Sequence, residues 1–76
     1  SDRERWTLNF ITAIRKDKFT IDDVIQFSSQ YKAQHTSVEE PDKEMRTAIR
    51  DLSEKGLLEI LDGKTIKKAY NIKKDC

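Results

Sequence analysis

Residues 41–56, PDKEMRTAIRDLSEKG, predict one helix with two distinct faces, and the rest of the chain can be interpreted around it. Its apolar residues recur at the three- and four-residue spacing that forms one stripe of a helix. These are Met45, Ala48, Ile49 and Leu52. The opposite face carries cationic and hydrogen-bonding side chains, namely Lys43, Arg46, Thr47 and Arg50. Gly56 is expected to end the helix, because glycine readily adopts the positive φ of a helix C-terminus. Such a helix fits a DNA major groove, and it is also typical of a solvated amphipathic helix.

Length and charge limit the class of protein. Seventy-six residues, of which 36% are hydrophobic and 38% charged, predict one small domain near the lower size limit for a single core. The net charge is +1, which does not by itself predict nucleic-acid binding. Residues 62–76 carry five lysines and two aspartates, whereas residues 1–61 carry ten basic and twelve acidic side chains. The basic surplus therefore lies at the C-terminal end.

Cysteine content and hydropathy indicate the compartment. Cys76 is the single cysteine and the last residue, so an internal disulfide cannot form. A reducing, cytoplasmic setting is expected. No signal peptide or long apolar run is apparent, and no membrane span is predicted. The chain starts at Ser-Asp without an initiator methionine, which favours a domain excised from a larger protein.

Residues 6–16 predict the first helix. Its apolar face is formed by Phe10, Ala13 and Ile14. If Thr7 is the N-cap, Trp6 can pack in front of the helix as part of a hydrophobic staple. If the helix begins earlier, Trp6 joins the apolar stripe. Both interpretations place Trp6 in the core, and the functional alternative is an exposed ring that stacks on a base.

Residues 18–20 predict a short strand, and residues 21–32 predict a second helix. Thr20 followed by Asp23 resembles a capping box at the start of that helix. Its buried stripe is expected to contain Ile21, Val24, Phe27 and Tyr31. The hydroxyl of Tyr31 is a candidate ligand contact, but the helical spacing favours a core position.

Residues 33–40 are polar and lack periodicity, which predicts a loop. His35 lies there without a second metal-binding residue at ligand spacing, so no metal site is predicted. Ser37 and Glu40 form a second capping-box pattern ahead of residue 41. Acidic residues cluster at the same place, namely Glu39, Glu40 and Asp42. They complement the helix dipole, but they would also repel a phosphate.

Residues 57–61 and 64–72 predict two strands joined by Asp62-Gly63 as a hairpin. Leu58 with Ile60, and Tyr70 with Ile72, are expected to face the core. Lysines lie at or near the tip, namely Lys64, Lys67 and Lys68. They are candidate phosphate contacts. The alternative is that they protect an exposed edge strand from aggregation.

The order helix, short strand, helix, loop, helix, strand, turn, strand predicts an α+β winged helix. This is a three-helix helix-turn-helix variant with a small antiparallel sheet and a hairpin wing. In that fold the third helix enters the major groove and the wing lies along the backbone or in the minor groove. The predicted third helix is residues 41–56, so its cationic face would point outward.

The sequence resembles the C-terminal winged-helix domain of DpnI-type restriction endonucleases. The resemblance is carried by the stretches WTxxFIxxI, KFTIDDV and MRxxIRDLxxKGLLEIL and by a final tyrosine. That family reads N6-methyladenine in double-stranded DNA. The resemblance extends from Trp6 to Tyr70, and much of it is core patterning that many winged helices share. It departs from the family at Thr47 and Ala48, in the acidic start of the helix, and in a longer lysine-rich wing.

The resemblance implies binding to double-stranded DNA through four residues of the third helix: Lys43, Arg46, Thr47 and Arg50. On chemical grounds Arg46 and Arg50 suit guanine edges or phosphates. Thr47 or Ala48 would meet the methyl group of an N6-methyladenine.

No catalytic set is recognised in these residues, so the domain is predicted to be non-catalytic, without cofactor, metal or small-molecule substrate. The catalytic domain of an endonuclease parent would lie elsewhere. The competing hypothesis is a winged helix that binds a protein partner, because function cannot be derived from the fold alone.

Overall fold

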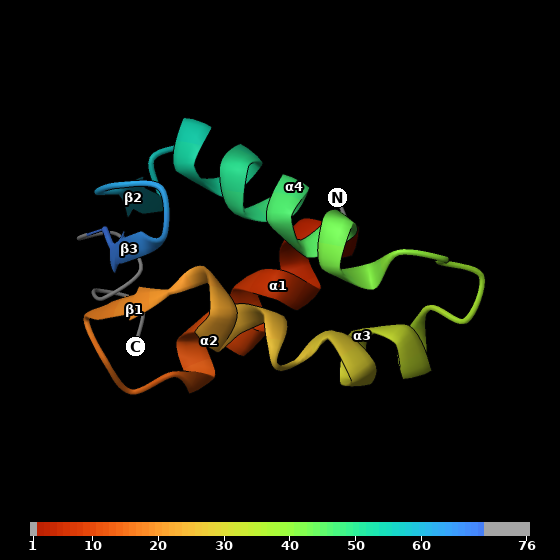
Figure 1. Ribbon diagram of the computed structural model, residues 1–76. Helices are drawn as coiled ribbons and strands as arrows, with labels where there is room; N and C mark the ends of the chain where they lie inside the picture. Colours follow the sequence, from red (N-terminus) through yellow and green to blue (C-terminus); the bar gives the residue numbers. More distant parts are fainter. Residues whose placement is uncertain (1, 70–76) are drawn as a thin grey trace.

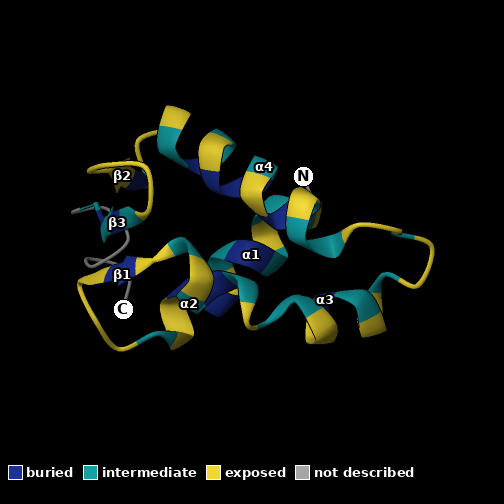
Figure 2. Ribbon diagram, in the orientation of Figure 1, coloured by how far each residue is buried: buried dark blue, intermediate teal, exposed yellow. Residues whose placement is uncertain are grey.

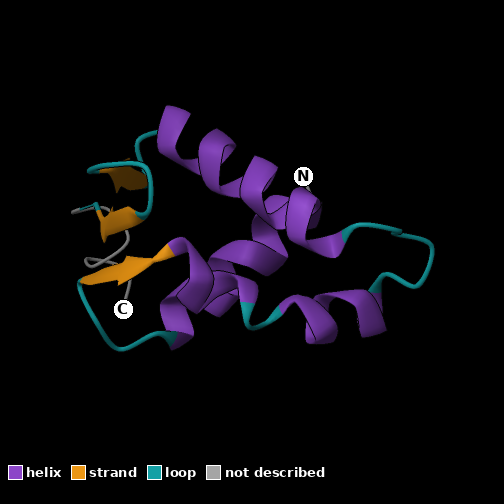
Figure 3. Ribbon diagram, viewed as in Figure 1, coloured by secondary structure: helices purple, strands orange, loops and turns teal. Residues whose placement is uncertain are grey.

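The structure is a computed structural model, and it describes residues 2–69. Figure 1 shows the elements in chain order: α1 (Asp2–Ala13), β1 (Lys18–Thr20), α2 (Ile21–Ile25), α3 (Ser28–Gln34), α4 (Pro41–Glu54), β2 (Leu58–Ile60) and β3 (Thr65–Lys68). The strands gather at one end of the helical body (Figure 3). The predicted α+β winged-helix arrangement is confirmed, with the second helix in two pieces. Within residues 2–69, no helix is long and apolar enough to cross a membrane.

The three strands form one antiparallel sheet in the order β1-β3-β2. Phe19 and Ile60 both lie opposite Ile66, and the side chains of Phe19, Ile66 and Leu58 are buried against the helices. Ile60, expected to face the core with Leu58, is 43% exposed instead. Tyr70 and Ile72 lie outside the described residues.

Residues 61–64 connect β2 to β3, so the connection is longer than the predicted Asp-Gly turn. The carboxylate of Asp62 accepts the backbone N–H groups of Lys64 and Thr65, both at 2.8 Å. This local bonding holds the loop in place of a two-residue turn. Leu61 donates its N–H to the carbonyl of Thr65 at 2.9 Å and closes the loop.

The continuous helix predicted over residues 21–32 is wrong, because the helix is broken at Gln26 and Phe27. The ring of Phe27 lies parallel to that of Phe10, with centroids 4.9 Å apart. The break therefore lets Phe27 stack on α1 while Val24 and Tyr31, on either side of it, both stay buried. The loop consequently begins after Gln34 and not at residue 33.

The caps of α2 and α4 test the local predictions. Thr20 and Asp23 form the predicted capping box, with the Asp23 N–H 3.1 Å from the Thr20 hydroxyl. The box predicted at Ser37 and Glu40 is wrong, because Glu40 is the N-cap of α4 and makes no side-chain cap bond. Proline at the first helical position carries no N–H that needs a cap.

Gly56 ends α4, as predicted from the sequence. Gly56 has φ of +82°. Its N–H donates to the Ser53 carbonyl, and the Leu57 N–H donates to the Leu52 carbonyl, both at 3.0 Å. These two bonds form a Schellman motif, which turns the chain directly into β2. The buried residues of α4 are the predicted set, Met45, Ala48, Ile49 and Leu52.

The first helix begins at Asp2, so an N-cap at Thr7 is wrong. Trp6 instead lies within α1 and packs half-buried against the core, with its ring 6.0 Å from that of Phe10. Tyr31 is 2% exposed, which confirms its core position. Thr7 is fully buried, and its hydroxyl has no hydrogen-bond partner among the described residues.

Thr7→Val is expected to raise the free energy of unfolding by about 1 kcal/mol, because it removes a desolvated hydroxyl and keeps the side-chain shape. For a domain of this size that corresponds to a rise of roughly 4–8 °C in Tm. Thermal unfolding followed by circular dichroism measures the change. Thr12→Val is the matched control, since the exposed Thr12 hydroxyl donates to the Asn9 carbonyl at 2.8 Å. A Tm for Thr7→Val below that of the wild type would show that the buried hydroxyl is satisfied.

His35 joins the start of α1 to the end of α3. Its Nδ1 lies 2.9 Å from the Tyr31 carbonyl and its Nε2 lies 2.9 Å from Asp2 Oδ2. Both neighbours are acceptors, so only the protonated ring can donate to both. The backbone bond to Tyr31 and the carboxylate of Asp2 therefore raise the pKa of His35. The bond from His35 correspondingly lowers the pKa of Asp2.

These shifts predict a stability that depends on pH. A histidine whose pKa is raised on folding stabilises the protein fully below its unfolded value of 6.5, and loses this contribution as pH rises through the folded pKa. Tm is therefore expected to be higher at pH 6 than at pH 8. His35 is the single histidine in the sequence, so His35→Gln should remove most of this difference. An unchanged pH dependence in His35→Gln would assign it to another group.

Candidate nucleic-acid interface

The predicted contact residues of α4 lie on its outward side. Lys43, Arg46 and Arg50 are exposed and Thr47 is half-buried. They point outward because the stripe of Met45, Ala48, Ile49 and Leu52 is fixed against the core. Figure 2 shows the exposed side of α4 turned away from α1. Ala48 belongs to the buried stripe, so the alternative of a methyl contact through Ala48 is wrong.

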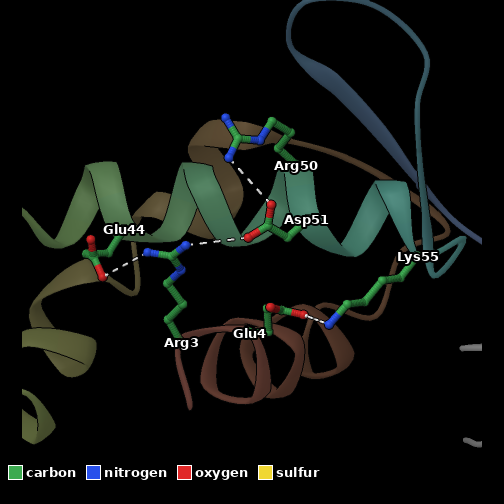
Figure 4. Close-up of polar contacts among 6 residues, drawn as sticks. All are labelled: Arg3, Glu4, Glu44, Arg50, Asp51 and Lys55. Carbon is green, nitrogen blue, oxygen red and sulfur yellow. Dashed lines mark hydrogen bonds and ion pairs between the residues drawn. The ribbon is translucent and has the colours of Figure 1, made fainter. Parts of the chain in front are cut away.

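Arg3 of α1 engages the acidic flank of α4. Its guanidinium lies 3.5 Å from Glu44 Oε1 and 3.5 Å from Asp51 Oδ2. Figure 4 shows these contacts beside the ion pair of Lys55 with Glu4. Partly exposed pairs of this kind contribute little stability individually. They matter more for the charge of the surface, because the guanidinium of Arg3 partly offsets the negative charges of Glu44 and Asp51 on the side of α4 that faces α1.

Arg50 extends from the other side of α4, away from α1 (Figure 4). Its side chain is 65% exposed, and its Nη2 lies 3.5 Å from Asp51 Oδ1. A contact of that length on an exposed arginine is weak. The guanidinium therefore keeps donors that can face a partner molecule.

The N-terminal end of α4 remains acidic. Glu39, Glu40 and Glu44 line a shallow depression of about 370 Å³ together with Lys43 and Val38. Lys43 is therefore surrounded by carboxylates, whereas Arg46 and Arg50 are farther along the helix. The cationic part of the face is therefore Arg46 and Arg50, which follow the first turn of α4. Glu39 and Glu40, two of the acids expected to repel a phosphate, lie beside Lys43 at the start of the helix.

The lysines of the wing differ from one another. Lys64 is exposed in the loop between β2 and β3. Lys67 is half-buried on the outer face of the sheet, opposite Lys18 and Glu59. Lys68 is only 8% exposed, and its ammonium donates to the Ile14 carbonyl at the end of α1. The assignment of Lys68 to phosphate contact is therefore wrong, because alternation along β3 turns Lys68 inward beside Ile66.

The fold brings two of the predicted contacts together. A cleft of about 290 Å³ lies between the start of α2, the side of α4 and the wing loop. We call this the α2–wing cleft, and it is lined by Thr20, Ile21, Asp22, Arg46, Gly63 and Lys64. Arg46 and Lys64 are 18 residues apart in sequence and belong to separate elements, α4 and the wing loop.

Two contributions to this surface were not predicted from the sequence. Arg3 contacts Glu44, which lies 41 residues later in the sequence. The start of α2 forms one wall of the cleft. Neither has a local signal, because each depends on how the helices pack. Within residues 2–69, no group of three or more His, Cys, Asp or Glu side chains is placed to hold a metal ion.

The sequence matches no model of a protein family and no curated protein.

Proposed function

We propose that this domain binds double-stranded DNA, with α4 in the major groove and the wing on the phosphate backbone. The observation that carries the proposal is the exposed Arg46–Arg50 edge of α4. Its acidic neighbours Glu44 and Asp51 both contact Arg3, and Asp51 shares its carboxylate between Arg3 and Arg50. Arginines on an exposed helix can donate two hydrogen bonds to a guanine edge or bind a phosphate. Lys64 supplies a further cation from the wing loop.

The resemblance to DpnI-type endonuclease domains supports a more specific version of this proposal, in which the domain reads N6-methyladenine. The N6 group of adenine lies in the major groove, where a methyl on it needs an apolar neighbour. Thr47 lies one position from Arg46 on the exposed side of α4 and can offer its methyl group. On this proposal the domain supplies binding alone, within a cytoplasmic modification-dependent endonuclease whose catalytic residues lie elsewhere.

The second candidate is a protein-binding winged helix. The net charge of +1 and the acids around Lys43 favour it. So do Ile60 and Leu61, which are 43% and 42% exposed on the hairpin. Adjacent exposed apolar residues are typical of contacts with proteins.

Titration with short duplexes separates these candidates. Unmethylated, hemimethylated and fully adenine-methylated duplexes of one sequence are compared at 50 and 200 mM salt by fluorescence anisotropy. The proposal expects binding that weakens with salt, as counterion release requires. Tighter binding to the methylated duplexes would support the specific version, and equal binding would reject it. Absence of binding to every duplex at 50 mM salt would reject DNA binding and favour the protein partner.

A further inference from the structure

The α2–wing cleft presents one cation from each of two walls. Arg46 reaches it from α4 and Lys64 from the wing loop. Both residues are exposed, and neither side chain has a hydrogen bond or ion pair with another described residue. Two cations that face one concave space, without a protein anion bonded to them, favour an anionic ligand. The cleft also contains Asp22, an exposed carboxylate on α2.

Lys64 is held in position by its own backbone. Its N–H donates to Asp62 Oδ1 at 2.8 Å, and its carbonyl accepts the N–H of Ile21 at 2.9 Å. The two bonds tie the wing loop to the start of α2. The Lys64 side chain therefore starts from a fixed point beside the cleft, which reduces the entropy lost when it binds a ligand.

The backbone donors at the start of α2 are already used. The Ile21 N–H bonds to Lys64, and the Asp23 N–H bonds to the Thr20 hydroxyl. An anion in the cleft would therefore be bound by the side chains of Arg46 and Lys64. These two groups can hold a single tetrahedral oxyanion from two directions.

We propose that the α2–wing cleft binds one backbone phosphate of DNA through Arg46 and Lys64 together, leaving Arg50 to contact base edges. This inference rests on the proposed DNA-binding function and divides the roles of the two arginines. Arg46 and Lys64 would set the position of α4 on the duplex, because phosphate contacts fix register without reading sequence. Arg50, which projects from α4 outside the residues that line the cleft, would carry sequence discrimination.

The role of Asp22 follows from the same geometry. Its carboxylate shares the cleft and would repel the incoming phosphate. Asp22→Asn is therefore expected to tighten DNA binding several-fold at low salt, with a smaller gain at high salt.

A double-mutant cycle tests whether the two cations share one phosphate. Single variants Arg46→Ala and Lys64→Ala are compared with the double variant on one duplex. If both bind the same phosphate, their effects are coupled, and the double variant loses about one unit of slope in log Kd against log salt, not two. The pair Arg50→Ala and Lys64→Ala is the control and should be additive. Additive losses for Arg46 and Lys64, with about two units of slope lost, would overturn the shared site.

Uncharged methylphosphonate linkages, placed one at a time in the duplex, identify the phosphate. One position should weaken wild-type binding several-fold and leave binding by the Arg46→Ala/Lys64→Ala variant unaffected, whereas Arg50→Ala should remain sensitive to it. If every position weakens the double variant as it does the wild type, the inference fails although DNA binding stands. If the wild type binds no duplex, the proposed function itself fails.

Discussion

Replacing Arg46 and Arg50 together by alanine is expected to lower affinity for duplex DNA by at least thirtyfold without unfolding the domain. Each arginine contact with a base edge or a phosphate contributes about 1–3 kcal/mol, so the loss of two corresponds to at least roughly that factor. Both side chains are exposed, and both lie opposite the buried stripe of α4. Anisotropy titrations measure the affinity, and thermal unfolding checks the fold.

The matched control removes two cations from another part of the surface. Arg15 and Lys16 are exposed in the connection between α1 and β1, so Arg15→Ala/Lys16→Ala makes the same change in net charge away from α4. This control should retain affinity within a few-fold of the wild type, because only the long-range field changes. Equal losses in the two double variants would show that binding depends on overall charge and that α4 is not the contact surface.

Lys68→Ala is expected to lower the free energy of unfolding by about 2–3 kcal/mol, which is a large part of the stability of a small domain. The corresponding fall in Tm is roughly 8–24 °C. The Lys68 ammonium satisfies the Ile14 carbonyl, and α1 has no basic residue in its own last turn. The variant leaves that carbonyl without its charged donor and removes a buried side-chain stem.

Two variants control the Lys68 measurement. Lys67→Ala, one residue away on the outer face of the sheet, should change stability by less than about 0.5 kcal/mol. Lys68→Met keeps most of the packing volume but not the charge, so its stability should lie between those of the wild type and Lys68→Ala. A Lys68→Ala protein as stable as the wild type but weaker in DNA binding would restore Lys68 to the phosphate contacts.

Features set by neighbouring residues could be predicted from the sequence. The α4 stripe follows from helical spacing, its end follows from the conformational freedom of Gly56, and the start of α2 follows from the Thr20–Asp23 box. The break between α2 and α3 could not be predicted, because it depends on Phe27 meeting Phe10 from another helix. The inward position of Lys68 follows from alternation with Ile66 along β3. Its acceptor, the carbonyl of Ile14, lies 54 residues away and has no local signal.

In the candidate site, too, some features follow from local sequence and others depend on how distant elements pack. Helical periodicity alone placed Lys43, Arg46, Thr47 and Arg50 on the outward face of α4. The neutralising contacts of Arg3 with Glu44 and Asp51 join residues more than 40 positions apart, so no local pattern indicates them. The α2–wing cleft depends on the Ile21–Lys64 backbone bond, which exists only once the sheet has formed.

DNA binding through α4 and the wing loop is tested most directly by a map of the surface that the folded domain uses to contact a duplex. A ¹⁵N-labelled sample is titrated with a short unmethylated duplex at low salt, and the amide shifts are followed by NMR. We expect the largest shifts at Arg46, Thr47 and Arg50 and in the wing loop of residues 61–64, with little change on α3. Shifts concentrated on α3 or on the α1–β1 connection, or no shifts at saturating duplex, would contradict it.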